Sequence, residues 1–171
     1  MEKMYSKSGL LAEAFETRVD GRQTGLYTLT NKSGSEITVT NYGAKIVSLM
    51  VPDKNGQLTD VVLGHPTIDD YLTSEEPYFG AVCGRTGNRI AKGRFTLGGI
   101  SYQLAVNNGP NALHGGIKGF NAVVWEVKRL SGSSIELFYL SHDGEEGYPG
   151  NLSVTIRWIF FTRQKPIKRP S

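Results

Sequence analysis

Two long polar segments, 80–93 and 106–121, carry the side chains of this sequence that are best suited to bind a ligand or move a proton. Both segments are rich in Gly and Asn, and both are longer than ordinary connections between strands. Polar loops held by a rigid sheet are where binding and catalytic sites are usually built. The hydrogen-bonding and titratable side chains that they contribute are Arg85, Asn88, Arg89, Asn107, Asn108, Asn111 and His114.

The other titratable side chains are predicted to have structural or surface roles. His65 and His142 lie outside these segments, and we expect both at the surface. Glu145 and Glu146 are adjacent, and neighbouring residues on a strand point to opposite faces, so a role in a turn is favoured over a paired-carboxylate site. Cys83 is the single cysteine, and we interpret it as a small buried apolar residue rather than a reactive thiol.

The elements that must position the two loops are predicted to be strands. Most of the chain alternates with a period of two and is rich in Val, Ile, Thr, Tyr and Phe, which is typical of strands with one buried face. Gly98-Gly99 predicts a tight hairpin, and one short helix is expected over 67–72. The fold class is therefore all-β, an antiparallel β-sandwich. Its candidate strands are 26–30, 36–41, 45–51, 59–64, 94–97, 100–104, 122–129, 134–141 and 152–158.

Composition and charge argue against membrane and nucleic-acid partners. No window approaches the roughly 18 apolar residues of a membrane span, and the first residues do not read as a secretion signal. The pI is about 9.0, but four basic residues lie in the last nine positions, so removing these four from the net +3 leaves −1 for the rest. The folded part therefore lacks the basic face of a nucleic-acid binder. A lone cysteine suits a reducing compartment, and we expect the protein to be cytoplasmic.

Three segments carry patterns that occur together in one known family. Residues 84–93 read G-R-T-G-N-R-I-A-K-G, residues 107–116 read N-N-G-P-N-A-L-H-G-G, and residues 143–150 read D-G-E-E-G-Y-P-G. In the same order they resemble the G-R-x-x-N-R-I-x-x-G, N-x-x-x-N-x-L-H-G-G and D-G-E-E-G-Y-P-G segments of the aldose 1-epimerases (galactose mutarotases). Three ordered matches make chance agreement improbable. The resemblance runs from about residue 26 to about residue 158.

The resemblance implies an isomerase that interconverts the α and β anomers of free aldoses such as galactose and glucose, with no metal and no organic cofactor. Ring opening requires a base that takes the anomeric hydroxyl proton and an acid that protonates the ring oxygen. The family's sugar-binding asparagine, arginine and histidine correspond to Asn88, Arg89 and His114. The resemblance implies that Arg89 binds sugar hydroxyls and that His114 is catalytic, next to the ring oxygen and the anomeric carbon.

The resemblance also implies that the chain holds only the N-terminal half of a galactose mutarotase-like supersandwich. We expect an N-terminal segment over 1–25, half of the sandwich over 26–158, and an atypical basic tail over 159–171. The family's second histidine, its late glutamate and its later sugar-binding aspartate have no counterpart in the sequence. The truncated chain is therefore expected to have little activity, and an exposed sheet edge is expected to favour self-association.

Two other functions stay open. The first is a carbohydrate-binding β-sandwich module that holds a sugar through Arg89 and His114 without turnover. The second, which is weaker, is an interaction module that uses its basic tail on nucleic acid or membrane. For Arg85, a loop anchor that bonds backbone carbonyls and a member of the site are equally favoured.

Overall fold

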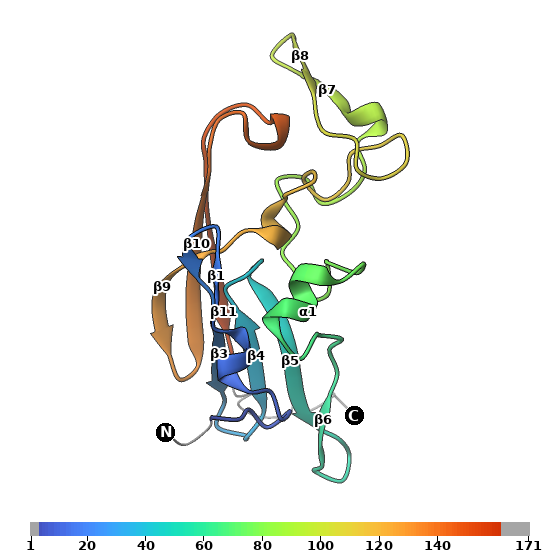
Figure 1. Cartoon of the computed structure of the whole chain (residues 1–171). Helices are drawn as coiled ribbons and strands as arrows, with labels where there is room; N and C mark the ends of the chain where they lie inside the picture. The colour runs from blue at the N-terminus through green and yellow to red at the C-terminus, as the bar shows by residue number, and fades with distance from the viewer. Residues whose placement is uncertain (1–3, 162–171) are drawn as a thin grey trace, which may run out of the picture.

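Most strand residues lie in two antiparallel sheets in the structure, a computed structural model that describes residues 4–161 (Figure 1). The larger sheet has the order β3-β4-β5-β6, formed by β3 (Leu26–Thr30), β4 (Glu36–Thr40), β5 (Lys45–Pro52) and β6 (Leu58–Asp60). The smaller sheet has the order β11-β10-β9, formed by β9 (Glu126–Ser131), β10 (Ser134–Ser141) and β11 (Leu152–Ile159). Two further hairpins join β1 (Arg18–Val19) to β2 (Arg22–Gln23) and β7 (Arg94–Leu97) to β8 (Ile100–Gln103). The helical elements are α1 (Ile68–Thr73) and the 3-10 turns η1 (Ala12–Phe15), η2 (Ala91–Gly93), η3 (Phe120–Ala122) and η4 (Glu145–Gly147).

The two sheets face each other across one apolar core, which confirms the predicted antiparallel β-sandwich. Leu29 and Val39 enter this core from the larger sheet, and Leu137 enters it from β10. Trp125, which directly precedes β9, is fully buried and donates its indole N–H to the carbonyl of Phe120 at 3.1 Å. The Trp125 and Phe120 rings meet edge to face at 5.6 Å, a favoured aromatic geometry. Packing of Trp125 in the core therefore fixes the position of the chain just after the second polar segment.

Alternation predicted the strands well where one face is buried. The predicted strands over 26–30, 94–97 and 134–141 match β3, β7 and β10 at both ends. The strand predicted over 122–129 begins only at Glu126, because η3 and the buried Trp125 interrupt the extended chain before it. The strand predicted over 59–64 shortens to Leu58–Asp60. Strands β1 and β2 were not predicted, because two residues each are too short to show alternation.

The Gly98-Gly99 hairpin and the short helix are also as predicted. Both glycines have positive φ, 59° and 81°, and Leu97 pairs with Ile100, so the turn holds only these two residues. The hairpin tip projects from the molecule, with Leu97 and Ile100 60% and 59% exposed (Figure 1). Helix α1 begins after Thr67, whose hydroxyl accepts a hydrogen bond from the Asp70 amide at 3.2 Å.

The expected division of the chain into the segments 1–25, 26–158 and 159–171 stays a prediction. Residues 4–25 contribute η1 and the β1–β2 hairpin, and Phe15 is fully buried in a second core cluster with Val47 and Tyr71. The basic tail falls almost wholly on residues 162–171, which lie outside the described part of the chain.

The two polar loops interlock through backbone contacts at glycines. Gly115 has φ 93°, and a Cβ placed on it would lie 1.6 Å from the carbonyl oxygen of Gly84. The same Gly84 oxygen accepts a hydrogen bond from the Phe120 amide at 3.1 Å. Further along, Ile90 and Ala112 exchange both backbone hydrogen bonds, at 2.9 and 3.1 Å. The loops are therefore held as one unit on the sandwich.

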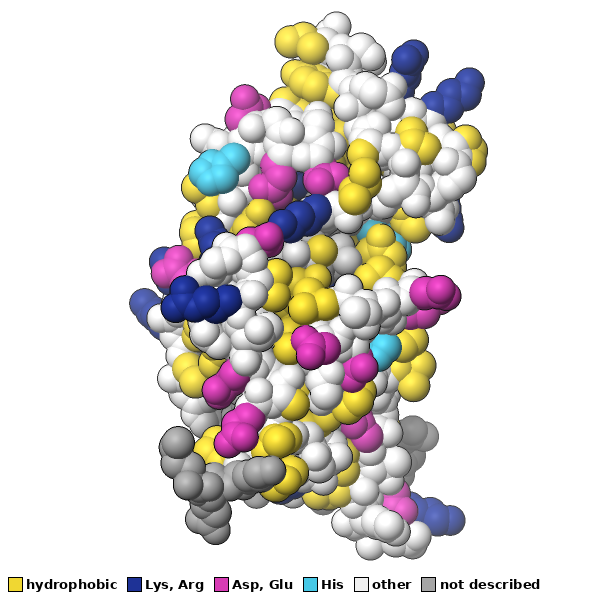
Figure 2. Space-filling model, in the orientation of Figure 1, with side chains coloured by type: hydrophobic (Ala, Val, Ile, Leu, Met, Phe, Trp, Pro, Cys, Tyr) yellow, Lys and Arg dark blue, Asp and Glu magenta, His cyan; other side chains and the backbone are white. Residues whose placement is uncertain are grey.

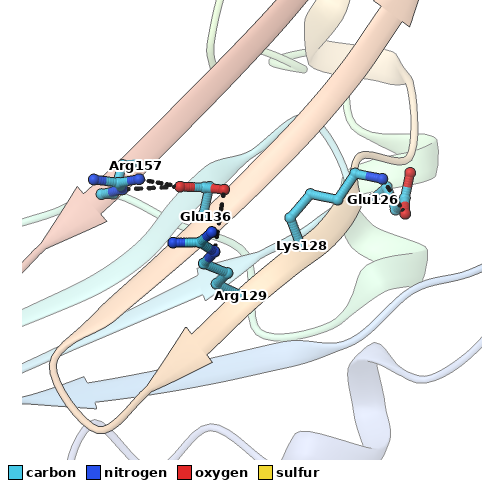
Figure 3. A network of polar contacts seen from close by, with 5 residues as sticks. All are labelled: Glu126, Lys128, Arg129, Glu136 and Arg157. Carbon is cyan, nitrogen blue, oxygen red and sulfur yellow. Dashed lines mark hydrogen bonds and ion pairs between the residues drawn. The ribbon is translucent and has the colours of Figure 1, made fainter.

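Charged side chains line the outer face of the smaller sheet (Figure 3). Glu136 on β10 accepts hydrogen bonds from Arg157 on β11, one of them from Nε at 3.0 Å, and lies 4.0 Å from Nε of Arg129 on β9. The hydrogen bond from Arg157 lowers the pKa of the Glu136 carboxyl. Lys128 pairs with Glu126 on the same face. These charged pairs, across strands and along β9, mark this face as the solvent side of the sheet.

Lys45, the first residue of β5, is fully buried without a carboxylate partner among the described residues. Its ammonium group donates to the carbonyl of Asn121 and lies over the rings of Tyr42 and Tyr71, at 4.7 and 5.4 Å. Burial lowers the pKa of this amine to about 7, although the nearby Cys83 thiol acts in the opposite direction. Removing the proton is therefore easier in the folded protein than in the unfolded chain.

We predict that the protein becomes more stable as pH rises from 6.5 to 8.5. The unfolded chain keeps Lys45 protonated in this window while the folded protein loses the proton near pH 7, so the unfolded state binds more protons and alkali favours folding. The free energy of unfolding, measured by urea denaturation, should rise by about 2 kcal/mol. Lys45→Met should flatten this rise, and Lys54→Met, at an exposed lysine, should leave it unchanged.

We also predict that Gly115→Ala destabilises the protein by about 3 kcal/mol, because the new methyl group would displace the Gly84 backbone at an unfavourable φ. Gly87→Ala in the partner loop is the matched control, since a Cβ there meets no atom within 4 Å. Equal denaturation midpoints for the two variants would show that the loops do not depend on this close approach.

Candidate functional site

His114 lies where the two loops meet, with its ring orientation fixed from two sides. Its Nδ1 is hydrogen bonded to the carbonyl oxygen of Gly87, and its ring meets that of Tyr78 edge to face at 4.6 Å. A carbonyl oxygen only accepts hydrogen bonds, so Nδ1 carries a proton. Nε2 is then the free position, able to accept a proton in neutral histidine or to donate one in the cation.

Arg89 and Asn88 lie beside Gly87 on the same exposed turn. The side-chain Oδ1 of Asn88 accepts a hydrogen bond from the backbone amide of Arg89 at 2.8 Å, which leaves the Asn88 NH2 group available. Arg89 donates from Nε to Asn108 Oδ1 at 2.8 Å, so the opposite loop orients its guanidinium group. Within the described residues, the two terminal nitrogens of Arg89 have no protein acceptor. Four N–H donors therefore remain for a ligand.

The three predicted site residues, Asn88, Arg89 and His114, are thus brought together. Because Gly87 contacts His114 and directly precedes Asn88, the two loops present amide, guanidinium and imidazole groups from one region of the surface. Asn107 shapes the second loop by donating to the carbonyls of Leu113 and Gly116, at 3.0 and 2.7 Å. Such a combination suits hydroxyl groups, which both donate and accept hydrogen bonds.

Arg85 is a structural anchor. Its guanidinium group donates to Ser141 Oγ at 2.8 Å and to four backbone carbonyls, of residues 141, 142, 149 and 150. No donor remains free for a ligand, so of the two roles left open for Arg85, the loop anchor holds. Arg85 ties the first loop to the turn between β10 and β11.

Glu145 and Glu146 have the structural roles that were favoured for them. Glu145 accepts hydrogen bonds from the Tyr139 and Ser141 hydroxyl groups, each at 2.9 Å. Glu146 accepts a hydrogen bond from the backbone amide of Ile117 at 2.7 Å and so supports the loop that carries His114. They do not form a paired-carboxylate site.

The remaining predictions had mixed outcomes. His142 is exposed, as expected. His65 is not an ordinary surface histidine, because its ring stacks on Phe79 at 5.4 Å and meets Tyr71 at 4.8 Å. Its buried Nε2 has no hydrogen-bond partner in the described part of the chain. Cys83 is half-buried rather than fully buried, and burial raises its thiol pKa, which opposes thiolate formation.

Two features of the site were missed at the sequence level. Tyr78 contacts the His114 ring although it lies in neither motif, and burial raises the pKa of its phenol. The Gly87 carbonyl fixes the His114 ring through a backbone atom, which no side-chain pattern reveals. Among residues 4–161, no group of three or more His, Cys, Asp or Glu side chains could hold a metal ion. No helix in the same range has the length and apolarity needed to cross a membrane.

Comparison with known proteins places this arrangement in a family. The aldose 1-epimerase family model matches residues 25–163. Galactose mutarotase from Bos taurus is 51% identical over 126 residues, which cover 74% of this chain and 35% of that protein, and aldose 1-epimerase from Escherichia coli K12 is 33% identical over 139 residues, covering 81% and 40%. The crystal structure of the GalM/aldose epimerase homologue from C. elegans superimposes with a TM-score of 0.77 at 33% identity, covering 81% of this chain and 42% of that one.

This chain thus spans little more than a third of the length of the curated relatives that it matches. The match nevertheless covers most of the chain, including both loops and the sheets that hold them. The chain belongs to the aldose 1-epimerase family.

Proposed function

We propose that Asn88, Arg89 and His114 bind an aldohexose, such as galactose or glucose, for the interconversion of its α and β anomers. The observation that carries the proposal is the convergence of the two family motifs, with free hydrogen-bonding groups on all three side chains. Arg89 donates to sugar hydroxyls, and the Asn88 amide adds a further donor. His114 Nε2 lies next to the ring oxygen and exchanges a proton with the reacting centre.

His114 supplies one of the two proton-transfer groups that the reaction needs. Guanidinium and amide groups do not exchange protons near neutral pH. Arg89 and Asn88 therefore orient the sugar and stabilise the negative charge that develops on its oxygen atoms during the reaction. Glu145 and Glu146 accept hydrogen bonds from Tyr139, Ser141 and the Ile117 amide, so we do not assign them the second proton transfer. The 171-residue chain on its own is therefore proposed to bind a sugar with little epimerase activity.

The first prediction from this proposal concerns binding. Arg89→Lys should weaken binding of methyl β-D-galactopyranoside about tenfold or more, because lysine lacks the planar fork of donors. This glycoside cannot open its ring, so NMR titration measures affinity alone. Arg129→Lys is the control, since the Arg129 side chain is 80% exposed on the outer face of the smaller sheet. Equal affinity for both variants would remove Arg89 from the site.

The second prediction concerns turnover. Polarimetry of freshly dissolved α-D-galactose should show a rate close to that of buffer alone. A saturable rate well above buffer, lost in His114→Asn, would show that one histidine suffices. Binding of the glycoside together with an uncatalysed rate would fit a carbohydrate-binding module equally well. To separate a binding module from half of an epimerase, the part of a full-length relative that follows the position of residue 159 is added to the chain. Recovered activity would favour half of an epimerase.

We also propose that the free edge of β11 makes the chain self-associate, and that it does so in the cytoplasm, a reducing compartment that suits its single cysteine. β11 pairs with β10 on one side, and no described strand pairs with its other side. Its inward residues Val154, Ile156 and Trp158 are only partly buried against the core. A second copy can pair with this edge and cover the apolar side chains.

Val154→Lys should therefore shift the protein toward the monomer, because it places a charge on the half-covered apolar face at the free edge. Sedimentation velocity over a range of concentrations measures this shift. Ser153→Lys, one residue earlier and exposed on the opposite face, is the matched control and should leave association unchanged. A wild-type chain that stays monomeric at all concentrations would contradict the proposal.

A further inference from the structure

Two adjoining hollows lie on the side of the molecule where the β1–β2 hairpin approaches β9 and the segment before it. Their volumes are about 450 and 440 Å³, within the range of small-molecule pockets. Both are lined by Arg22 and Val124, so Arg22 stands between them as a shared wall. Neither is lined by Asn88, Arg89 or His114. In the space-filling view, acidic and basic side chains gather beside an apolar patch on the upper part of the face shown (Figure 2).

Arg22 can serve both hollows. Its Nη1 donates to the carbonyl of Val124 at 3.1 Å, which holds the guanidinium group across the groove. Its other N–H groups have no hydrogen-bond acceptor among the described residues. A guanidinium group has five N–H donors in one plane, so four remain, enough to donate to ligand atoms on either side.

The 440 Å³ hollow, called the first hollow, combines charges of both signs over an apolar floor; the 450 Å³ hollow is called the second. Asp20 and Lys118 form an ion pair at 2.6 Å, and the remaining charged groups are Arg22, Glu145 and Glu146. Three acids against two bases leave a formal charge of −1, which disfavours a phosphate and is too small to attract a polycation. Neighbouring carboxylate and cationic groups instead suit hydroxyl groups, each of which donates to an acid and accepts from a base. Val123 and Val124 offer C–H surface beneath.

Tyr139 adds a neutral polar group to the same hollow. Its hydroxyl donates to Glu145 at 2.9 Å and keeps an oxygen lone pair that can accept from a ligand. Burial and then the Glu145 carboxylate raise the Tyr139 pKa, so the phenol stays protonated throughout the physiological range. The phenol oxygen and the neighbouring carboxylate can therefore each accept a hydrogen bond from a ligand hydroxyl group.

The second hollow is less charged and has an aromatic wall. Gln23 and Glu126 supply polar groups at its exposed side, and the half-buried Tyr27 supplies ring surface. Asn41 also lines it, but its amide is fully engaged with the backbone of Gln23, Gly25 and Trp125. Polar side chains around an aromatic face suit a sugar ring, which has hydroxyl groups at its edge and C–H groups on its faces.

We propose that this groove is a second carbohydrate-binding site, which holds a neutral sugar of two units across Arg22, one unit in each hollow. It is separate from the Arg89 and His114 site, because neither of these side chains lines either hollow. His114 contacts the first polar loop, whereas Glu146, which lines one hollow, accepts a hydrogen bond from the Ile117 amide. The proposal rests on residues that the proposed function does not use.

The experiment is an NMR titration of the 171-residue chain with methyl β-lactoside, a two-unit sugar that cannot open its ring. Backbone amide signals of residues 20–23 and 124–127 should shift together and saturate. Methyl β-D-galactopyranoside, with one unit, should bind this groove at least about tenfold more weakly, because it loses the hydrogen bonds of one hollow. Inorganic phosphate should leave these signals unmoved.

Variants separate the two sites. Arg22→Lys should weaken the lactoside about tenfold at 20–23 and 124–127, because the fork of donors is lost while the charge stays. Gln23→Ala, at an exposed position of the same groove, should weaken it less but in the same region. Arg89→Lys should leave these shifts intact while it weakens shifts at 84–89 and 107–116. Spectra of the free variants report whether each is folded.

Three results would overturn the proposal. The first is a lactoside titration whose shifts are confined to 84–89 and 107–116. The second is an Arg22→Lys variant and a Gln23→Ala variant that both bind as the wild type does. The third is saturable binding of phosphate in the groove. Failure of the Arg89 and His114 site would leave the groove shifts in place, so the two proposals fail independently.

Discussion

The site of this protein depends on one steric constraint, the contact between the backbones of Gly84 and Gly115. No side chain fits between them, and the same Gly84 carbonyl receives the amide of Phe120. The contact allows Gly87 to reach the His114 ring, and it lets Ile90 and Ala112 pair farther along. Glycine is therefore required here for close approach, beyond its freedom at positive φ.

The sandwich core and the loops support each other through a few polar bonds. Trp125 fills the core and ties its indole N–H to the end of the second loop, while Arg85 ties the first loop to the turn after β10. Both are strong hydrogen-bond donors placed where loop carbonyls would otherwise lack partners. As a result, the groups proposed to bind a sugar sit on loops, but their positions are set by two sheets.

Local patterns in the sequence predicted the parts of the structure that local forces decide. Alternation located β3, β7 and β10 to the residue, and two glycines located the β7–β8 turn. The motifs located Asn88, Arg89 and His114, which the fold does bring together. What remained hidden depends on distant partners. No local pattern predicts that Lys45 is buried against two aromatic rings, or that His65 stacks on Phe79. The contact of Tyr78 with His114 likewise exists only after the chain folds back.

The β7–β8 hairpin is a suitable place to insert additional residues. Its turn consists of Gly98 and Gly99, where an added Cβ would meet no other atom within 4 Å, and within residues 4–161 its strands pair only with each other. Extra residues placed between the two glycines would extend into solvent without crossing the core or the loops. A fluorescent or affinity label could thus be built into the middle of the sequence, to report on the protein without touching the surfaces proposed to bind sugars.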